Sequence, residues 1–585
     1  MSNLDFASEN RLVRHSSYRY IFPPMLGMIF AQIAPVVDSI CVSANPAMGE
    51  EALSAIGIIT PLSYVFNIIC ALGGIGCGVV ISRCSGAGEK AKAARVFTRT
   101  LITLAVVSLI LTAVCIVFAD PLLRLLSATP ENYGFAREYL LVTMAGSIFM
   151  VMNFAGDYIL ANDNNEKLAM AGDIAGAVVN MVIDYVGIFV LHCGIWIVAL
   201  GTVLGSVVCF CIYLLHFRKK DRLCRIVRPK RKEGDPSLFE ILKPGSAEAL
   251  MYLFFTVQLI VQNFVLCEDG GTSGLGNSAL MENLALVFTI VIAGCTDAIY
   301  PMASAYHGEQ NKSDMLMAKR SLTKSGFIML GIPVVLLCVF PHLAMFPYKI
   351  DDPVMLETLP LAIRLVSINQ LLIFIDTMLI DYLSATEQEK KANLAFMVQF
   401  VVQIPLTLLL NQWADMNSPW YAALIAQAAV LVYLCFFCGD LPKGMQKFHR
   451  ENLLLLKGGR LTPSLVNDFE SSAGQILSEK QQETLRQQMI LPLLGILSEG
   501  VHPFGCFTVL ERNDNRLSAI LHYESKKDLL EDLPEGPEDD EDDEDEELQE
   551  EVPPDTCTRS EFLGMRRLMI ILSRPGDEPS ARETA

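Results

Sequence analysis

Long apolar runs alternate with short polar segments from near the start of the chain to about residue 438. Each run is about 20 residues or longer, which is the length that an α-helix needs to cross the hydrocarbon core of a bilayer. The pattern therefore predicts twelve transmembrane helices in two sets of six. The runs lie near 17–42, 53–82, 98–119, 137–161, 168–191 and 194–216, and then near 239–267, 278–305, 323–346, 356–384, 391–411 and 418–438.

The composition supports a polytopic membrane protein. Apolar residues make up 52% of the 585 residues and charged residues only 19%, and the mean hydropathy is +0.40. These values are too apolar for an ordinary soluble protein of this length. The net charge of −19 is local, because the run from Glu531 to Glu551 holds fifteen acids and the remaining residues carry only −4. We expect this run to be a solvated linker.

The distribution of Lys and Arg predicts the orientation in the membrane. Basic residues gather in nearly every second loop, including the strongly basic segment between the two sets of helices. Short loops rich in Lys and Arg stay in the cytoplasm. We therefore expect both ends of the chain to be cytoplasmic. The predicted divisions are an N-terminal tail (1–16), a six-helix lobe (17–216), a basic hinge loop (217–237), a second six-helix lobe (238–440) and a cytoplasmic domain (441–585).

The two lobes resemble copies of one repeat. The segment "ISRCSGAGEKAKAAR" after the second run has a counterpart in "MASAYHGEQNKSDMLMAKR" after the eighth, so that Gly88-Glu89 aligns with Gly308-Glu309. Two similar halves with a site near their interface are typical of secondary transporters.

The region after Asp440 has a different pattern. "LSEKQQETLRQQMILPLLGIL" predicts an amphipathic helix, "CFTVLERNDNRLSAILHYES" predicts a hairpin with its turn at Asn513–Asn515, and "MRRLMIIL" is a later apolar element. We expect a small α+β domain with a disordered acidic insertion at 531–556. Its order is faintly similar to the ATP-binding fold of anti-sigma factors and histidine kinases, but the helix lacks the Glu and Asn of that fold. We therefore expect a degenerate domain that is non-catalytic or regulatory, with an unknown cytoplasmic protein as its partner.

The apolar run "AGAVVNMVIDYVGIFVLHCG" carries Asn180 and, one helical turn later, Asp184. A carboxylate in an apolar medium costs several kcal/mol unless it is paired, protonated or hydrated. Counting from the outer ends of the runs, Asp38 and Thr202 lie at a depth similar to that of Asp184. Such a set of oxygen ligands suits Na⁺, while two nearby carboxylates suit a proton. The alternatives are hydration of Asp38 and an interhelical hydrogen bond of Asp184.

Several motifs resemble those of the multidrug and toxic compound extrusion (MATE) transporters over about 17–440. "FPPMLGMIFAQIAPVVDSI" is similar to the family's first helix, "GIGCGVVISRCSGAGEKAKAARVF" to its second helix and basic loop, and "NMVIDYVGIFVLHCGIWIVALGTVLG" to its fifth and sixth helices. The resemblance implies that Asp38, Asn180, Asp184 and Thr202 match the cation site of the N-terminal lobe. The segments "VSANPAMGEEAL" and "LANDNNEK" depart from the family pattern, which affects subfamily and substrate more than fold.

Polar residues inside the predicted helices give further candidates. We expect Pro23, Pro24 and Pro35 to form a hinge in the first helix, because proline weakens the hydrogen bonding of a helix. The second lobe carries intramembrane acids and amides, each with an alternative as a helix cap or a loop residue. The candidates for lining a substrate cavity are Glu248, Asp297, Asp376, Gln258 and Gln403, and Asp381, Gln262 and Gln399 are further polar positions.

Together these features predict a secondary active antiporter of the plasma membrane that exports amphipathic, often cationic compounds in exchange for Na⁺ or H⁺. We expect no enzymatic activity, no cofactor, no metal beyond the coupling ion and no nucleic-acid partner; the partners are a small-molecule substrate and membrane lipids. One alternative is a flippase for a lipid-linked precursor, which needs cationic cavity residues, whereas Arg364 is the only basic residue well inside a predicted helix. The other alternative is a membrane sensor that signals through its C-terminal domain.

Overall fold

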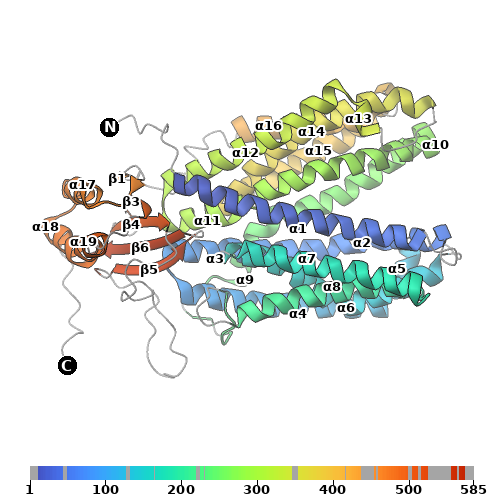
Figure 1. Ribbon diagram of the computed structural model, residues 1–585. Coiled ribbons are helices and arrows are strands. Elements are labelled where there is room, and N and C mark those ends of the chain that lie inside the picture. The colour runs from blue at the N-terminus through green and yellow to red at the C-terminus, as the bar shows by residue number, and fades with distance from the viewer. Residues whose placement is uncertain are drawn as a thin grey trace.

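The structure is a computed structural model, shown in Figure 1. A bundle of long helices occupies one end of the molecule and a small sheet domain the other, as Figure 1 shows. The residues that the structure describes are 11–43, 49–126, 132–163, 165–218, 224–229, 231–232, 234–345, 353–414, 417–436, 454–455, 459–498, 503–511, 516–524, 555, 557–562 and 565–573.

The helices form two lobes with α1 (Arg11–Ser43) between them (Figure 1). The first lobe contains α2 (Gly49–Cys70), the π-helical η1 (Ala71–Ile75), α3 (Gly76–Ala87), α4 (Lys90–Val117), α5 (Ala119–Leu125), α6 (Tyr133–Asn162), α7 (Glu166–Tyr185), the π-helical η2 (Val186–Val190) and α8 (Trp196–Phe217). Short α9 (Leu238–Leu242) and η3 (Lys243–Gly245) lead to the second lobe. That lobe contains α10 (Ser246–Thr296), α11 (Ile299–Glu309), α12 (Lys312–Val339), α13 (His342–Met345), α14 (Pro353–Ala385), α15 (Glu389–Ala414) and α16 (Ser418–Phe436).

The predicted all-helical membrane fold is confirmed, with two differences in detail. Among the described residues, eleven helical segments are long and apolar enough to cross a membrane. The predicted run 17–42 lies in α1 but is not one of the eleven. The runs 239–267 and 278–305 were expected as separate elements, yet α10 is continuous from Ser246 to Thr296 and contains parts of both. The connecting residues carry glycine and polar side chains, which describe a loop in sequence but do not prevent helical backbone.

The two lobes meet through α3 and α11, whose backbones pack directly on each other. A Cβ atom on Gly86 would lie 2.0 Å from the Ala305 carbonyl oxygen, and one on Gly308 would lie 2.0 Å from the Arg83 carbonyl oxygen. Only glycine permits such contact. The repeat identified in the sequence therefore corresponds to a contact in space, because the two similar loop segments touch.

The C-terminal domain is an antiparallel sheet with helices on one face. Its strands are β1 (Leu454–Leu455), β2 (Gly459–Arg460), β3 (Phe504–Glu511), β4 (Leu517–Glu524), β5 (Cys557–Phe562) and β6 (Met565–Leu572), in the order β1-β3-β4-β6-β5 with β2 also on β3. The helices are α17 (Pro463–Ala473), α18 (Glu479–Leu485), the π-helical η5 (Arg486–Ile490) and α19 (Leu491–Ser498). The predicted helix and hairpin are present. The turn at Asn513–Asn515 and the acidic run lie outside the described residues.

The core of this domain is formed by one face of the sheet and the helices. Phe469 of α17 stacks on Phe507 of β3 with ring centroids 4.3 Å apart, and Leu521, Leu568 and Ile570 join the same buried cluster. Alternate residues of β4 and β6 point to the other face. On that face, His522 and Arg567 contact the ends of α3 and α11. We call this end of the helical bundle the docked end, defined by Ser85–Gly88 and Gly308–Asn311.

Candidate functional site

Three helices bring Asp38, Asn180, Asp184 and Thr202 together. Asp38 lies in α1, Asn180 and Asp184 lie one turn apart on α7, and Thr202 lies in α8. With its amide nitrogen facing Asp38, Asn180 donates to Asp38 Oδ1 at 3.1 Å. Its amide oxygen then accepts from the backbone N–H of Thr202 at 3.1 Å and from the Thr202 hydroxyl at 3.3 Å. The structure thus places all four predicted cation-site residues in one cluster.

The carboxyl group of Asp184 is buried without a hydrogen-bond donor. The residue is 0% exposed, and neither carboxyl oxygen has a hydrogen-bond partner in the described part of the chain. The carboxyl group of Asp38, which is itself 8% exposed, lies beside it. Two buried carboxyl groups side by side repel each other when both are charged. A bound cation or a shared proton removes this cost, so the donor set fits Na⁺ or H⁺.

Small residues on α7 and α8 allow this close arrangement. A Cβ atom on Gly201 would lie 2.5 Å from Asp184 Oδ1 and 3.3 Å from the Asn180 amide nitrogen. One turn deeper, a Cβ atom on Gly176 would lie 2.9 Å from the Gly205 carbonyl oxygen. Glycine at these positions lets the two helices approach and leaves space for the Asp184 side chain.

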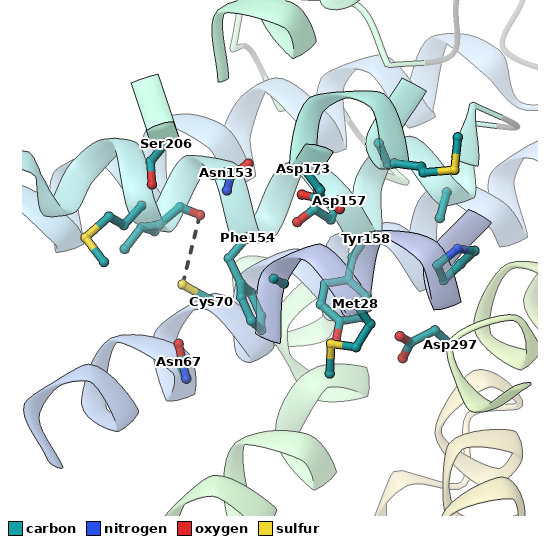
Figure 2. Close-up of a pocket in the computed structure, with 18 of the residues that line it drawn as sticks. Met28, Asn67, Cys70, Asn153, Phe154, Asp157, Tyr158, Asp173, Ser206 and Asp297 are labelled. Carbon is teal, nitrogen blue, oxygen red and sulfur yellow. Dashed lines mark hydrogen bonds between the residues drawn. The ribbon is translucent and has the colours of Figure 1, made fainter. Parts of the chain in front are cut away.

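A cavity of about 380 Å³ lies deeper in the bundle, lined mostly by the first lobe. Figure 2 shows Met28, Phe154 and Tyr158 around it, with Asp157 and Asp173 together on one side and Asp297 on the other. Asp297, at the junction of α10 and α11, is the one predicted cavity residue in its lining. Among the described residues that line it, none is Lys or Arg.

Asp157 and Asp173 were not predicted from the sequence. Asp157 lies in α6 and Asp173 in α7, and the Tyr213 hydroxyl of α8 donates to Asp157 and lies 3.4 Å from Asp173 Oδ1. One oxygen from each carboxyl and the Cys209 sulfur lie within 4.8 Å of one another. The signal was present, because both acids fall inside predicted helices, where an ionisable side chain is costly.

The remaining predicted residues of the second lobe lie elsewhere. Gln258 and Gln403 line a separate cavity of about 60 Å³ among Phe254, Phe396 and Phe400. Glu248 and Asp376 line neither cavity. In this structure the described cavities separate Gln258 and Gln403 from Asp297, since the rotation of each helix about its axis decides which side chain faces inward. That Glu248, Asp297, Asp376, Gln258 and Gln403 line a substrate cavity stays a prediction.

Two of the acids in the second lobe differ in their surroundings. Asp381 accepts a hydrogen bond of 2.8 Å from the Tyr300 hydroxyl. Asp376 of α14 is 1% exposed, and neither of its oxygens has a partner among the described residues. Asp376 thus resembles Asp184 in burial and in having no hydrogen-bond partner among the described residues, but Asp184 also has the carboxyl group of Asp38 beside it.

The predicted hinge prolines lie within a continuous helix. Pro23, Pro24 and Pro35 are all inside α1, which is assigned as one helix from Arg11 to Ser43. Pro24 lines the 380 Å³ cavity, and Asp38 lies three residues after Pro35. A change in the backbone of α1 would therefore move residues of both the cavity and the cation cluster.

Comparisons with known proteins agree with this architecture. The MatE family model matches residues 23–186. The multidrug export protein MepA of Staphylococcus haemolyticus is 23% identical over 433 residues, covering 74% of this chain and 94% of the relative. MepA of Staphylococcus aureus is 23% identical over 425 residues, covering 71% and 92%.

Solved structures show the same fold. A MATE family transporter of the MOP superfamily in an outward-facing conformation aligns with a TM-score of 0.69 and 22% identity, over 76% of this chain and 99% of that chain. A MOP superfamily transporter from Pyrococcus furiosus, described as having a binding pocket of reverse polarity, aligns with a TM-score of 0.68 and 22% identity over the same shares. Residues 23–186 thus match the MatE family, and the chain as a whole is similar in sequence and fold to MATE transporters with many membrane-spanning helices.

Proposed function

We propose that this chain is a multidrug exporter that couples the entry of Na⁺ or H⁺ to the export of amphipathic, often cationic compounds. The relatives named as multidrug export proteins support the export of drugs. In this proposal the two lobes alternate between opening at the docked end and opening at the far end. The basic loops favour a cytoplasmic docked end.

The observation that carries the proposal is the unpartnered, buried Asp184 beside Asp38. Intramembrane acids are costly and are retained where they bind ions or substrate. Asp38 belongs to α1, whereas Asp184 belongs to α7, so a cation between them links the two helices. Binding of the cation favours close packing of α1 on α7, and its release favours their separation. Because α1 also lines the 380 Å³ cavity, ion binding and cavity shape are coupled through this helix.

The lining of the cavity supports a cationic substrate. Asp157, Asp173 and Asp297 contribute carboxyl groups, while aromatic and methionine side chains supply apolar contacts. A fourth lining acid, Glu166, is already paired with Arg19. Aromatic faces and carboxylates both attract organic cations. A flippase for a pyrophosphate-linked precursor would need basic residues here. Arg364 does not supply one, because it is exposed on α14 and its Nε donates to the Cys338 carbonyl oxygen at 3.0 Å.

The test is efflux of a cationic dye from vesicles that contain the full chain, with Na⁺ and pH gradients imposed separately. We expect Asp184→Asn and Asp38→Asn each to abolish gradient-driven efflux while leaving the amount of folded protein unchanged. The gradient that drives the wild type identifies the coupling ion. Asp120→Asn is the matched control, because Asp120 is an exposed acid of the same lobe at its far end. Normal efflux by both site variants would refute the assignment of the cation site.

A further inference from the structure

The C-terminal domain buries charged side chains against the docked end. Arg567 of β6 and His522 of β4 are each 2% exposed, and Glu309 at the end of α11 is 1% exposed. His522 Nε2 and Glu309 Oε1 lie 3.0 Å apart, and Arg567 Nη1 lies 3.2 Å from the same oxygen. Buried charges at a domain interface are retained only where they are well paired, so this contact is specific.

Arg567 binds both lobes at once. Its Nη2 donates to the Ser85 carbonyl oxygen at 3.0 Å and its Nη1 to the Gly86 carbonyl oxygen at 3.0 Å, both at the end of α3 in the first lobe. The Nη1 group also reaches Glu309 of the second lobe. Its Nε donates to Ser560 Oγ of the neighbouring strand at 3.0 Å, which fixes the guanidinium within its own domain. One side chain therefore joins α3, α11 and the C-terminal sheet.

The ends of these two helices need such a partner. The last carbonyl groups of a helix accept no hydrogen bond from a backbone N–H of the same helix, and the helix dipole favours a positive charge at this end. Arg567 supplies both the donors and the charge to α3. Glu309, in contrast, is an acid at the carboxyl end of α11, where the dipole disfavours it, and the C-terminal domain supplies the basic groups that compensate.

Apolar contacts surround the charged group. Met565 and Cys506 of the sheet belong to the same buried cluster as Leu12 of α1 and Met315 of α12. The rings of Tyr306 and His522 pack edge to face with centroids 6.5 Å apart. The domain thus contacts α1, α3 and α11, which come from both sides of the interface between the lobes.

We propose that the C-terminal domain is an interlobe clamp that holds the docked end closed. The inference rests on the proposed alternating access, because opening this end requires Gly86 and Gly308 to separate from the opposite helix. Arg567 cannot keep Ser85, Gly86 and Glu309 together once α3 and α11 move apart. Undocking of the domain, or release of one lobe by Arg567, must therefore accompany each opening. The alignments with the solved transporters cover 99% of those chains but only 76% of this one. About a quarter of this chain, which is the size of the C-terminal domain, therefore lies outside the alignment.

The rate at which the Cys84 thiol is modified measures how often the docked end opens. Cys84 is 5% exposed, precedes Ser85 on α3 and lines a cavity of about 790 Å³ at this end. The full chain in lipid nanodiscs is treated with N-ethylmaleimide, and mass spectrometry follows the modification of Cys84 separately from that of Cys77, which lies two turns deeper and is 0% exposed. We expect Arg567→Ala and Glu309→Gln to accelerate modification of Cys84 by about tenfold or more, because each removes hydrogen bonds to a charged group. Cys77 should change little.

Arg566→Ala is the matched control. It removes the same side chain from the same strand, but by strand alternation Arg566 points to the opposite face. We expect it to leave Cys84 modification at the wild-type rate. Arg567→Lys covers the case in which the alanine variant does not fold: it keeps the charge but cannot reproduce the planar, forked donation of arginine, so faster modification is again expected.

The outcomes separate the clamp from the transport proposal. The clamp alone would be overturned if the wild type exports the dye but Cys84 is modified at the same rate in the wild type and in every Arg567 and Glu309 variant. Faster modification in Arg567→Ala together with Cys77 would indicate general unfolding and would also count against it. Absence of wild-type efflux under either gradient would overturn the proposed function, whatever the labelling shows.

Discussion

The buried acids of the two lobes have different neighbours. In the first lobe Asp184 lies beside Asp38 of another helix, with Asn180 and Thr202 in the same cluster. In the second lobe Asp376 is equally buried and, like Asp184, has no hydrogen-bond partner among the described residues, whereas Asp184 has the carboxyl group of Asp38 beside it. A cation between two helices can alter how they pack, whereas protonation of a single acid changes only its own surroundings. This difference favours the proposal that the first lobe carries the coupling role.

A second difference lies in the aligned pair Glu89 and Glu309. Glu89 follows α3 and forms an ion pair of 3.0 Å with Lys92, with both side chains 27% exposed. Glu309 at the end of α11 is buried and pairs with Arg567 and His522. The same position of the repeat is therefore a surface residue in one lobe and a domain contact in the other.

Neutralising one acid in each lobe should produce the largest contrast. We expect Asp184→Asn to lower gradient-driven efflux by at least about 100-fold, equivalent to about 2.7 kcal/mol. Asp376→Asn should keep efflux within about threefold of the wild type, because its side chain lines neither described cavity. Initial rates of dye efflux at equal protein amounts provide the measurement. An equal loss in both variants would show that the coupling role is shared by the lobes.

The sequence was sufficient to predict that the four polar residues of the candidate cation site lie together. It was not sufficient to place the acids of the second lobe. Asp38, Asn180, Asp184 and Thr202 could be brought together because three neighbouring helices, their depth and one i, i+4 spacing restrict the possibilities. Glu248 and Asp376 could not be placed, because depth does not define the rotation of a helix about its axis. Asp157 and Asp173 also lie within predicted helices, so the cost of an intramembrane acid marks them as candidates from the sequence alone.

The contrast between Glu309 and Glu89 predicts the next largest effect. Glu309→Gln leaves the buried Arg567 without its charged partner, so we expect a loss of about 3 kcal/mol in stability. Glu89→Gln removes only a partly exposed ion pair and should cost less than about 1 kcal/mol. Thermal unfolding of the full chain in detergent compares the two variants. Equal shifts in melting temperature would contradict a stabilising role for the buried ion pair of Glu309 and Arg567.

Docking of the C-terminal domain could not be predicted from the sequence. The alternation of strand residues places His522 and Arg567 on one face of the sheet, but nothing in the pattern shows what covers that face. The repeat aligns Gly308-Glu309 with Gly88-Glu89, and Glu89 is partly exposed, so similarity alone would have predicted a surface loop. Only the tertiary contact distinguishes the two positions.

Glycine substitutions test how tightly the first lobe is packed around Asp184. Gly201→Ala places a methyl group about 2.5 Å from Asp184 Oδ1, so the carboxyl group must move. We expect efflux to fall about tenfold, with a loss of stability near 1 kcal/mol. Gly331→Ala in α12 of the second lobe is the matched control, because nothing lies within 4 Å of its Cβ position. This control should be neutral or slightly stabilising through helix propensity.

The smallest expected effect concerns acid stability, and it compares two ion pairs of the first lobe. Asp235 of the hinge loop pairs with Arg95 at 2.9 Å, and both side chains are buried. Burial raises the pKa of Asp235, but the hydrogen bonds and charge of Arg95 outweigh this effect, so that its pKa lies below the usual range. At the far end, hydrogen bonds from Tyr133 and then Arg137 lower the pKa of Asp120, which is exposed.

A carboxyl group with a lowered pKa stabilises the fold above its unfolded pKa of about 3.9, and this contribution is lost as the pH falls through the folded value. We therefore expect Asp235→Asn to lower the melting temperature at pH 7, and the difference from the wild type to shrink once the pH is below about 4. Asp120→Asn should show little change at either pH, because solvent screens an exposed ion pair. Melting temperatures of both variants and the wild type, measured from neutral to acidic pH, test this prediction. A constant difference for Asp235→Asn at every pH would mean that packing of the hinge loop on α4, rather than the charge of Asp235, provides its stabilisation.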